Sequence, residues 1–194
     1  MHRTMFDTPV ISHLLRAGSS LYLRLKGWKI TGEIPRDLRK CVMIAAPHTS
    51  NWDLPYMLMI AFVMRTPIYW MGKKSIFKPP FKHLMMWMGG VPVDRSKSNN
   101  MVDASIATIK TNDRLFLIVP PEGTRSKVSD WKTGFYHIAN GAQVPILMGF
   151  LDYQRKTGGV LGTFKPTGDV QQDIADIRKH YAHIAGRITD KYQA

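Results

Sequence analysis

Apolar residues recur at helical spacing near the start of the chain. Thr8-Pro9 is a typical helix start, and the apolar positions after it are Ile11, Leu14, Leu15, Tyr22 and Leu25. Arg16, Arg24 and Lys26 occupy other positions on the helical wheel. The pattern predicts a basic amphipathic helix within residues 1–27, which Gly18-Ser19-Ser20 could interrupt. Packing on its own domain and packing on lipid both fit such a helix.

Beyond residue 27, short apolar runs typical of strands alternate with helical patterns. Strands are expected at 28–31, 41–46, 68–71, 91–93, 115–119 and 144–151. Helices are expected from about residue 54, around 81–88, and over 102–111, 134–140 and 174–192. This alternation predicts a single α/β domain over residues 28–194, with a central, mostly parallel sheet flanked by helices and preceded by the N-terminal amphipathic helix.

Charge narrows the range of partners. The 194 residues include 27 Lys and Arg against 14 Asp and Glu, a net charge of +13, so an anionic partner is expected. No acidic residue lies between Asp53 and Asp94, where lysines alternate with methionines and aromatic residues. Basic side chains beside large apolar ones suit a lipid interface. Phospholipid, phosphorylated small molecules and nucleic acid all remain compatible with the charge alone.

The chain shows no sign of a secretory signal or of a transmembrane helix. Residues 1–7 lack a charged start and an apolar core, and the longest strongly apolar stretch, 54–64, is too short to cross a bilayer. Cys41 is the single cysteine, which fits a reducing compartment. These features predict a peripheral protein on the cytoplasmic side of a membrane.

His48 and Asp53 are the first candidates for chemistry. Five residues along a continuous helix would place them on different faces, but Thr49-Ser50-Asn51 favours a turn, and Pro55 is tolerated only in a helix's first turn. The Asp53 carboxylate could then reach Nδ1 of His48, leaving Nε2 to act as a general base. The alternative is that Asp53 caps the helix, or Ser50 starts a capping box, with His48 incidental.

Two further polar segments follow predicted strands. Glu122-Gly123-Thr124-Arg125 follows the strand at 115–119, and Arg95 follows the strand at 91–93. In α/β sheets, ligands bind beyond the carboxyl ends of strands, and these residues offer cations, a hydroxyl and a carboxylate. Either segment alone could also be a solvated surface turn.

Taken in this order, the three segments resemble the motif blocks of the glycerolipid acyltransferase family, of the PlsC-like, 1-acylglycerol-3-phosphate acyltransferase type. His48 and Asp53 match the family's His-x4-Asp block, Arg95 closes its second block, and residues 122–125 match its Glu-Gly-Thr-Arg block. Val144-Pro145-Ile146 resembles the short fourth block. Pro47 departs from the asparagine that many members carry, which leaves the acceptor headgroup open.

The resemblance implies transfer of a fatty acyl group from an acyl thioester, acyl-CoA or acyl carrier protein, to the hydroxyl of a lysophospholipid or glycerol-phosphate-type acceptor. His48 and Asp53 would be catalytic, and the acceptor would contact Lys73, Arg95, Glu122, Gly123, Thr124 and Arg125. No bound cofactor, metal ion or nucleic acid is expected. The alternatives are a basic nucleic-acid-binding domain, or a lipid or thioester hydrolase that uses the same histidine.

Overall fold

The computed structural model describes residues 3–93, 98–126, 128, 130–188 and 190. Within them, seven strands form one sheet in the order β1-β7-β6-β2-β5-β3-β4. The strands are β1 (Lys29–Thr31), β2 (Lys40–Ala46), β3 (Ile68–Lys73), β4 (Gly90–Val93), β5 (Leu115–Ile118), β6 (Ile146–Asp152) and β7 (Thr157–Phe164). Neighbours are parallel except for the antiparallel pair β6 and β7. The predicted α/β fold with a mostly parallel sheet is confirmed.

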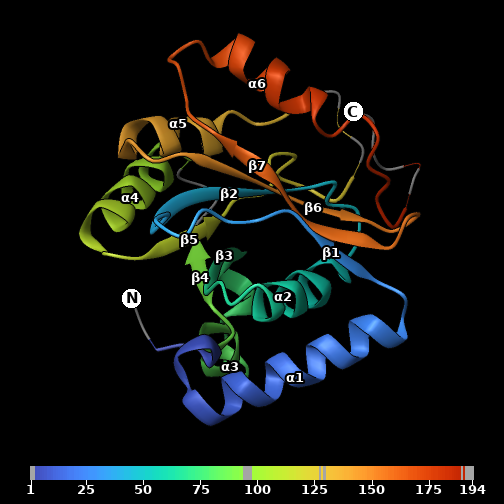
Figure 1. Ribbon diagram of the computed structural model, residues 1–194. Helices are drawn as coiled ribbons and strands as arrows, with labels where there is room; N and C mark the ends of the chain where they lie inside the picture. The colour runs from blue at the N-terminus through green and yellow to red at the C-terminus, as the bar shows by residue number, and fades with distance from the viewer. Residues whose placement is uncertain (1–2, 94–97, 127, 129, 189, 191–194) are drawn as a thin grey trace.

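Helices cover both faces of the sheet. Figure 1 shows α1, α2 and α3 on one side and α4, α5 and α6 on the other. Their bounds are α1 (Pro9–Leu25), α2 (Asp53–Val63), α3 (Lys82–Trp87), α4 (Ser98–Thr111), α5 (Gly134–Ala142) and α6 (Val170–Lys179), with short 3-10 helices η1 (Met5–Asp7) and η2 (Lys74–Ile76). The predicted N-terminal helix is present, runs unbroken through Gly18, and packs on α2.

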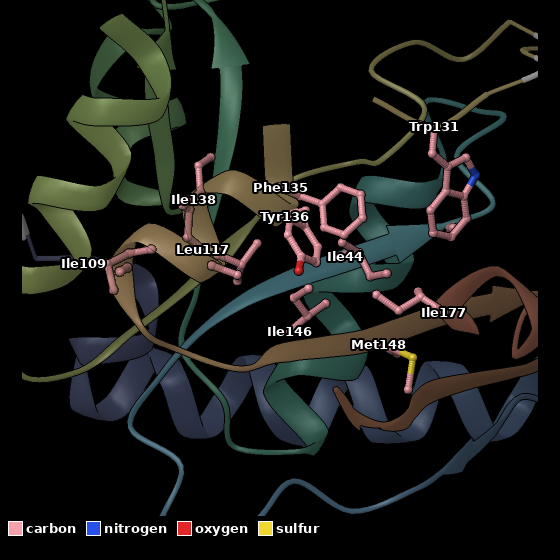
Figure 2. Close-up of a cluster of buried hydrophobic side chains, with 14 of the residues drawn as sticks. Ile44, Ile109, Leu117, Trp131, Phe135, Tyr136, Ile138, Ile146, Met148 and Ile177 are labelled. Atoms are coloured by element: carbon pink, nitrogen blue, oxygen red, sulfur yellow. The ribbon is translucent and has the colours of Figure 1, made fainter. Parts of the chain in front are cut away.

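Apolar packing on both faces fixes the central strands. Figure 2 shows Phe135 and Tyr136 of α5 and Ile177 of α6 packed with Ile44 and Ile146 of the sheet. On the other face, side chains of α2 pack against the outer and central strands. Strands covered on both faces read as continuous apolar runs, which explains why β2 and β5 were recognisable in the sequence. The ends of these strands are therefore a rigid platform.

Two sequence expectations fail in the last third of the chain. The strand β7 was not predicted, and the closing helix begins at Val170 and ends at Lys179 instead of spanning 174–192. The Asp169 side chain caps its start by accepting a hydrogen bond from the Gln172 N–H. Beyond α6 the chain turns and runs back toward the loop after β2, where the N–H of Ile188 donates to the Thr49 hydroxyl.

None of the helices in the described part of the chain combines the length and the apolar character that a membrane crossing would require.

Candidate active site

The loop between β2 and α2 brings His48 and Asp53 together. Nδ1 of His48 lies 3.1 Å from Oδ2 of Asp53. An ionised carboxylate can only accept, so the Nδ1 position carries the proton and Nε2 is left with its lone pair. Asp53 is 6% exposed, whereas the His48 side chain is 28% exposed. The buried carboxylate thus fixes the tautomer of a histidine that solvent can reach.

Asp53 also shapes the turn that carries His48. Its Oδ2 accepts hydrogen bonds from the backbone N–H groups of Thr49 and Ser50, both at 2.9 Å. Both donors precede the helix, so these hydrogen bonds do not cap α2. The N-cap residue of α2 is Trp52, which makes no side-chain capping hydrogen bond. The capping alternative for Asp53 is therefore wrong. One carboxylate folds the turn and orients the imidazole.

Glu122 supports the same turn from the loop after β5. Its two carboxylate oxygens accept from the backbone N–H of His48 at 3.1 and 3.0 Å, and the residue is only 3% exposed. The sequence assigned Glu122 to the acceptor, but the structure turns its carboxylate toward the His48 backbone. Burial raises the pKa of Glu122 from 4.5 to about 7, and the His48 N–H and imidazole only partly offset that rise.

The raised pKa of Glu122 predicts a pH dependence of stability. Between about pH 4.5 and 7 the folded chain holds a proton that the unfolded chain has lost, so this group's contribution falls as pH rises through that window. The loss is about 3 kcal/mol. Glu122→Gln removes the titrating group. Urea unfolding at about pH 5 and about pH 7.5 should therefore show that the free energy of unfolding of the variant rises relative to that of the wild type at the higher pH. The exposed Glu33→Gln is the control, and a pH-independent difference for Glu122→Gln would contradict the assignment.

His48 stands on the wall of a cavity of about 650 Å³, within the usual range for ligand sites. The polar part of the lining includes three cations, Lys73, Arg125 and Lys132, together with Thr124 and the Asp53 carboxylate. The remaining wall is largely apolar, formed between the sheet and α2 by Met43, Met57, Ile60, Met64, Ile68 and Trp70. The cavity therefore combines cations, an apolar wall and the His48 imidazole in one lining.

The carboxyl ends of parallel strands explain this convergence. β2, β3, β5 and β6 run in the same direction, so the residues that follow them meet at one edge of the sheet. Lys73 ends β3, and Gly123, Thr124 and Arg125 follow β5. These predicted residues all line the cavity with His48. Arg95 lies outside the described residues, so its position is not part of this geometry.

The backbone of the loop after β5 is partly committed to its own turn. Gly123 has φ +66°, in the left-handed region that favours glycine, and its N–H donates to the Pro120 carbonyl at 3.2 Å. A Cβ there would lie 3.2 Å from Cγ of Lys132. The Gly123 N–H is thus engaged in the turn. The backbone N–H of Thr124, the next residue, is a candidate donor toward a developing oxyanion.

Two residues of the site escaped the sequence analysis. Lys132 lines the cavity, and the Tyr153 hydroxyl donates to Oδ1 of Asp53 at 2.9 Å. Lys132 has no local pattern around it that distinguishes it from other surface lysines. Tyr153 does follow a predicted strand, but no spacing in the sequence connects it with Asp53.

Comparisons with known proteins identify the family. A sequence model described as Acyltransferase matches residues 28–148, more than half of the chain. The 1-acyl-sn-glycerol-3-phosphate acyltransferases of Haemophilus influenzae and Escherichia coli are each 30% identical over 132 residues, 63% of this chain and 53% and 52% of theirs. The chain therefore spans about half the length of the curated relatives it matches.

A solved structure shares the fold. The crystal structure of the 1-acyl-sn-glycerophosphate acyltransferase PlsC from Thermotoga maritima superposes with a TM-score of 0.60 at 19% identity, covering 91% of this chain and 82% of that one. At that identity the likeness supports the architecture only. Because the family match spans most of the sheet and both segments that meet at His48, we conclude that this chain belongs to the PlsC-like acyltransferase family.

Proposed function

We propose that the chain transfers a fatty acyl group from an acyl thioester, carried by coenzyme A or acyl carrier protein, to the hydroxyl of a lysophospholipid or glycerol-phosphate-type acceptor. One observation carries the proposal: the His48 imidazole, held by Asp53, lines the same cavity as three cations and a largely apolar wall. Such a cavity matches a substrate with a phosphate, a hydroxyl and an acyl chain. The names of the relatives point to the same chemistry.

The reaction needs no covalent intermediate on the protein. Nε2 of His48 removes the proton from the acceptor hydroxyl as its oxygen attacks the thioester carbonyl. The tetrahedral oxyanion then collapses, the carbon–sulfur bond breaks, and the imidazolium returns its proton to the thiolate. Asp53 stabilises the imidazolium during both steps, and the Thr124 N–H is the proposed oxyanion donor. An ester and a free thiol leave the site.

The cations beside His48 supply the acceptor's binding site. Lys73, Arg125 and Lys132 line the cavity, and their charge suits a phosphate, while the Asp53 carboxylate of the same lining already accepts from His48 and Tyr153. Arg95 joins this set in the proposal on the strength of its sequence block. Holding the phosphate in this way fixes the distance between the acceptor hydroxyl and Nε2, which contributes to the rate through orientation.

Loss of one of these cations tests the acceptor site. Arg125→Ala should raise the KM for a phosphate-bearing acceptor by roughly 10- to 100-fold, the value of one charge-assisted hydrogen bond, and leave the donor KM unchanged. Arg39→Ala is the control, because Arg39 is an exposed arginine just before β2, at the opposite edge of the sheet. Steady-state kinetics with each substrate varied would measure both constants. An unchanged acceptor KM would remove Arg125 from the site.

Helix α1 is the proposed membrane contact. Four apolar residues on one side of it are 59–76% exposed: Val10, Leu14, Leu21 and Leu25. The opposite side packs on the domain through Leu23 and Ser19, which are buried. These four residues form an apolar stripe that faces outward, which suits a lipid interface. In the proposal, Arg24 and Lys26 lie near anionic headgroups. In the proposal, residues 1–27 dock on the cytoplasmic side of the membrane and residues 28–194 form the acyltransferase domain.

The apolar stripe makes the membrane proposal testable. The double substitution Leu14→Glu with Leu21→Glu should lower binding to vesicles that contain anionic phospholipid by at least about tenfold, because two leucines lose their burial in lipid. His13→Glu with Ser20→Glu places the same two charges on exposed positions of α1 outside the stripe. Vesicle co-sedimentation measures both. Equal losses in the two variants would show that charge, and not the stripe, holds the chain.

A further inference from the structure

The second carboxylate oxygen of Asp53 has its own partner. While Oδ2 accepts from His48, Thr49 and Ser50, Oδ1 accepts from the Tyr153 hydroxyl at 2.9 Å. Each oxygen thus has a separate task. A carboxylate held at one oxygen can rotate about its bond to Cβ, whereas one held at both oxygens is fixed in plane as well as in position.

The fold places Tyr153 at this point. The tyrosine follows directly after β6, which pairs in parallel with β2, so it emerges at the same edge of the sheet as the turn that carries His48. Its backbone N–H donates to the Ala185 carbonyl at 3.0 Å. The strand on one side and the returning C-terminal segment on the other therefore set the position of its backbone.

Aromatic and cationic contacts set the direction of the ring. The Tyr153 ring meets Trp28 edge-on, with centroids 5.2 Å apart, and Tyr56 at 5.6 Å. The guanidinium of Arg187 lies 5.9 Å from its centroid. Such contacts prefer defined angles, so they resist rotation of the ring. The hydroxyl is held against Asp53 by its surroundings as well as by the hydrogen bond.

The protonation state of Tyr153 suits a permanent donor. Burial and then the charge of Asp53 raise the pKa of the phenol, although Arg187 opposes that rise. The titratable and charged groups that act on it are Asp53, Tyr56 and Arg187. The phenol remains an O–H group at neutral pH and donates to Oδ1 throughout a reaction cycle in which His48 gains and loses a proton.

We propose that Tyr153 is a positioning residue for acyl transfer, whose hydroxyl locks the Asp53 carboxylate in the orientation that holds the His48 imidazole. This inference rests on the proposed function of His48. Tyr153 lies beyond residues 28–148, the part of the chain matched by the family, so the family match does not assign it a role. It acts only through Asp53.

Tyr153→Phe tests the role because it keeps the ring and its packing and removes only the donor. The kcat for acyl transfer should fall about tenfold, the value of one hydrogen bond to a charged group, with unchanged KM for donor and acceptor. Tyr56→Phe is the matched control: it keeps the ring that packs on Tyr153 and removes a hydroxyl that is not among the described hydrogen-bond donors to Asp53. Its kcat should stay within about twofold of the wild type.

Proton NMR provides a readout that does not depend on turnover. The Nδ1–H of His48, identified by its loss in His48→Ala, should change chemical shift in Tyr153→Phe and keep it in Tyr56→Phe. If the wild-type protein shows no acyl transfer, the proposed function is wrong, but the Nδ1–H signal of His48 still tests whether Tyr153 positions the Asp53 carboxylate. A Tyr153→Phe variant with wild-type kcat and an unshifted signal would overturn the inference. So would equal losses of kcat in both tyrosine variants, or a raised KM at constant kcat.

Discussion

His48→Ala is expected to lower kcat for acyl transfer by roughly 10²- to 10⁴-fold, the contribution typical of a positioned general base. The fold should survive, because the His48 side chain is partly exposed and its loss empties no core. Asp53 would still accept hydrogen bonds from Thr49, Ser50 and Tyr153, so no bare charge is left buried. Steady-state kinetics and thermal unfolding of the same preparation measure the two effects.

The control for this variant is His137→Ala. His137 lies on α5 with an exposed side chain, and α5 covers the other face of the sheet from α2. The His137→Ala variant should transfer acyl groups at the wild-type rate. A folded His48→Ala protein that keeps near wild-type kcat would refute the role of His48 as base.

Asp53→Asn should have the second large effect, a loss of kcat of about 10³- to 10⁴-fold, as expected when an orienting carboxylate is replaced by its amide. Asparagine carries no negative charge to stabilise the imidazolium, and it does not enforce the tautomer with the proton on Nδ1. In the wild type, Thr49 and Ser50 donate to one carboxylate oxygen of Asp53 and Tyr153 donates to the other. Whichever way the asparagine amide is oriented, its NH₂ group would therefore face a hydrogen-bond donor.

The same substitution should therefore cost stability as well as rate. A buried donor without a partner costs about 1–3 kcal/mol, so urea unfolding should show a loss of that size. The exposed Asp37→Asn makes the same change of charge and should alter neither kcat nor stability. An Asp53→Asn protein with kcat within about tenfold of the wild type would show that the carboxylate is not the orienting group.

The fold was recognisable in the sequence wherever local pattern and tertiary burial agree. Continuous apolar runs marked β2 and β5, which helices cover on both faces of the sheet (Figure 1). The strand β7 was missed because Gly158, Gly159 and Gly162 interrupt its apolar pattern, and glycine disfavours strands. Gly159 allows a close approach between strands, because a Cβ there would lie 2.0 Å from the Thr31 carbonyl oxygen of β1.

The closing helix was overextended for a related reason. Ile174, Ile177, Tyr181, Ile184 and Ile188 recur at helical spacing, yet the helix ends at Lys179. The chain then turns back to the loop after β2, where a Cβ on Gly186 would lie 2.8 Å from the Thr49 side chain. The helical spacing of the apolar residues does not reveal this tertiary contact, which requires the chain to leave the helix.

The site shows the same division. His48 and Asp53 were identified from a segment of six residues, but only the structure showed that Asp53 contacts His48 and the turn before α2 instead of capping the helix. Glu122 was assigned to the acceptor because a carboxylate in a loop looks available to ligands, and the structure instead directs it to the His48 N–H. Tyr153 reaches Asp53 across 100 residues of chain, and no local pattern encodes such a contact.

The most direct test of the central claim is mass spectrometry of the lipids formed by the purified protein. The wild type and His48→Ala would each receive mixed lysophospholipids with either acyl-CoA or acyl carrier protein loaded with a fatty acid. The proposed function predicts that the wild type adds one acyl chain to a phosphate-bearing acceptor and that His48→Ala does not. Release of free fatty acid without an acylated acceptor, or the same acylated product from His48→Ala, would contradict it.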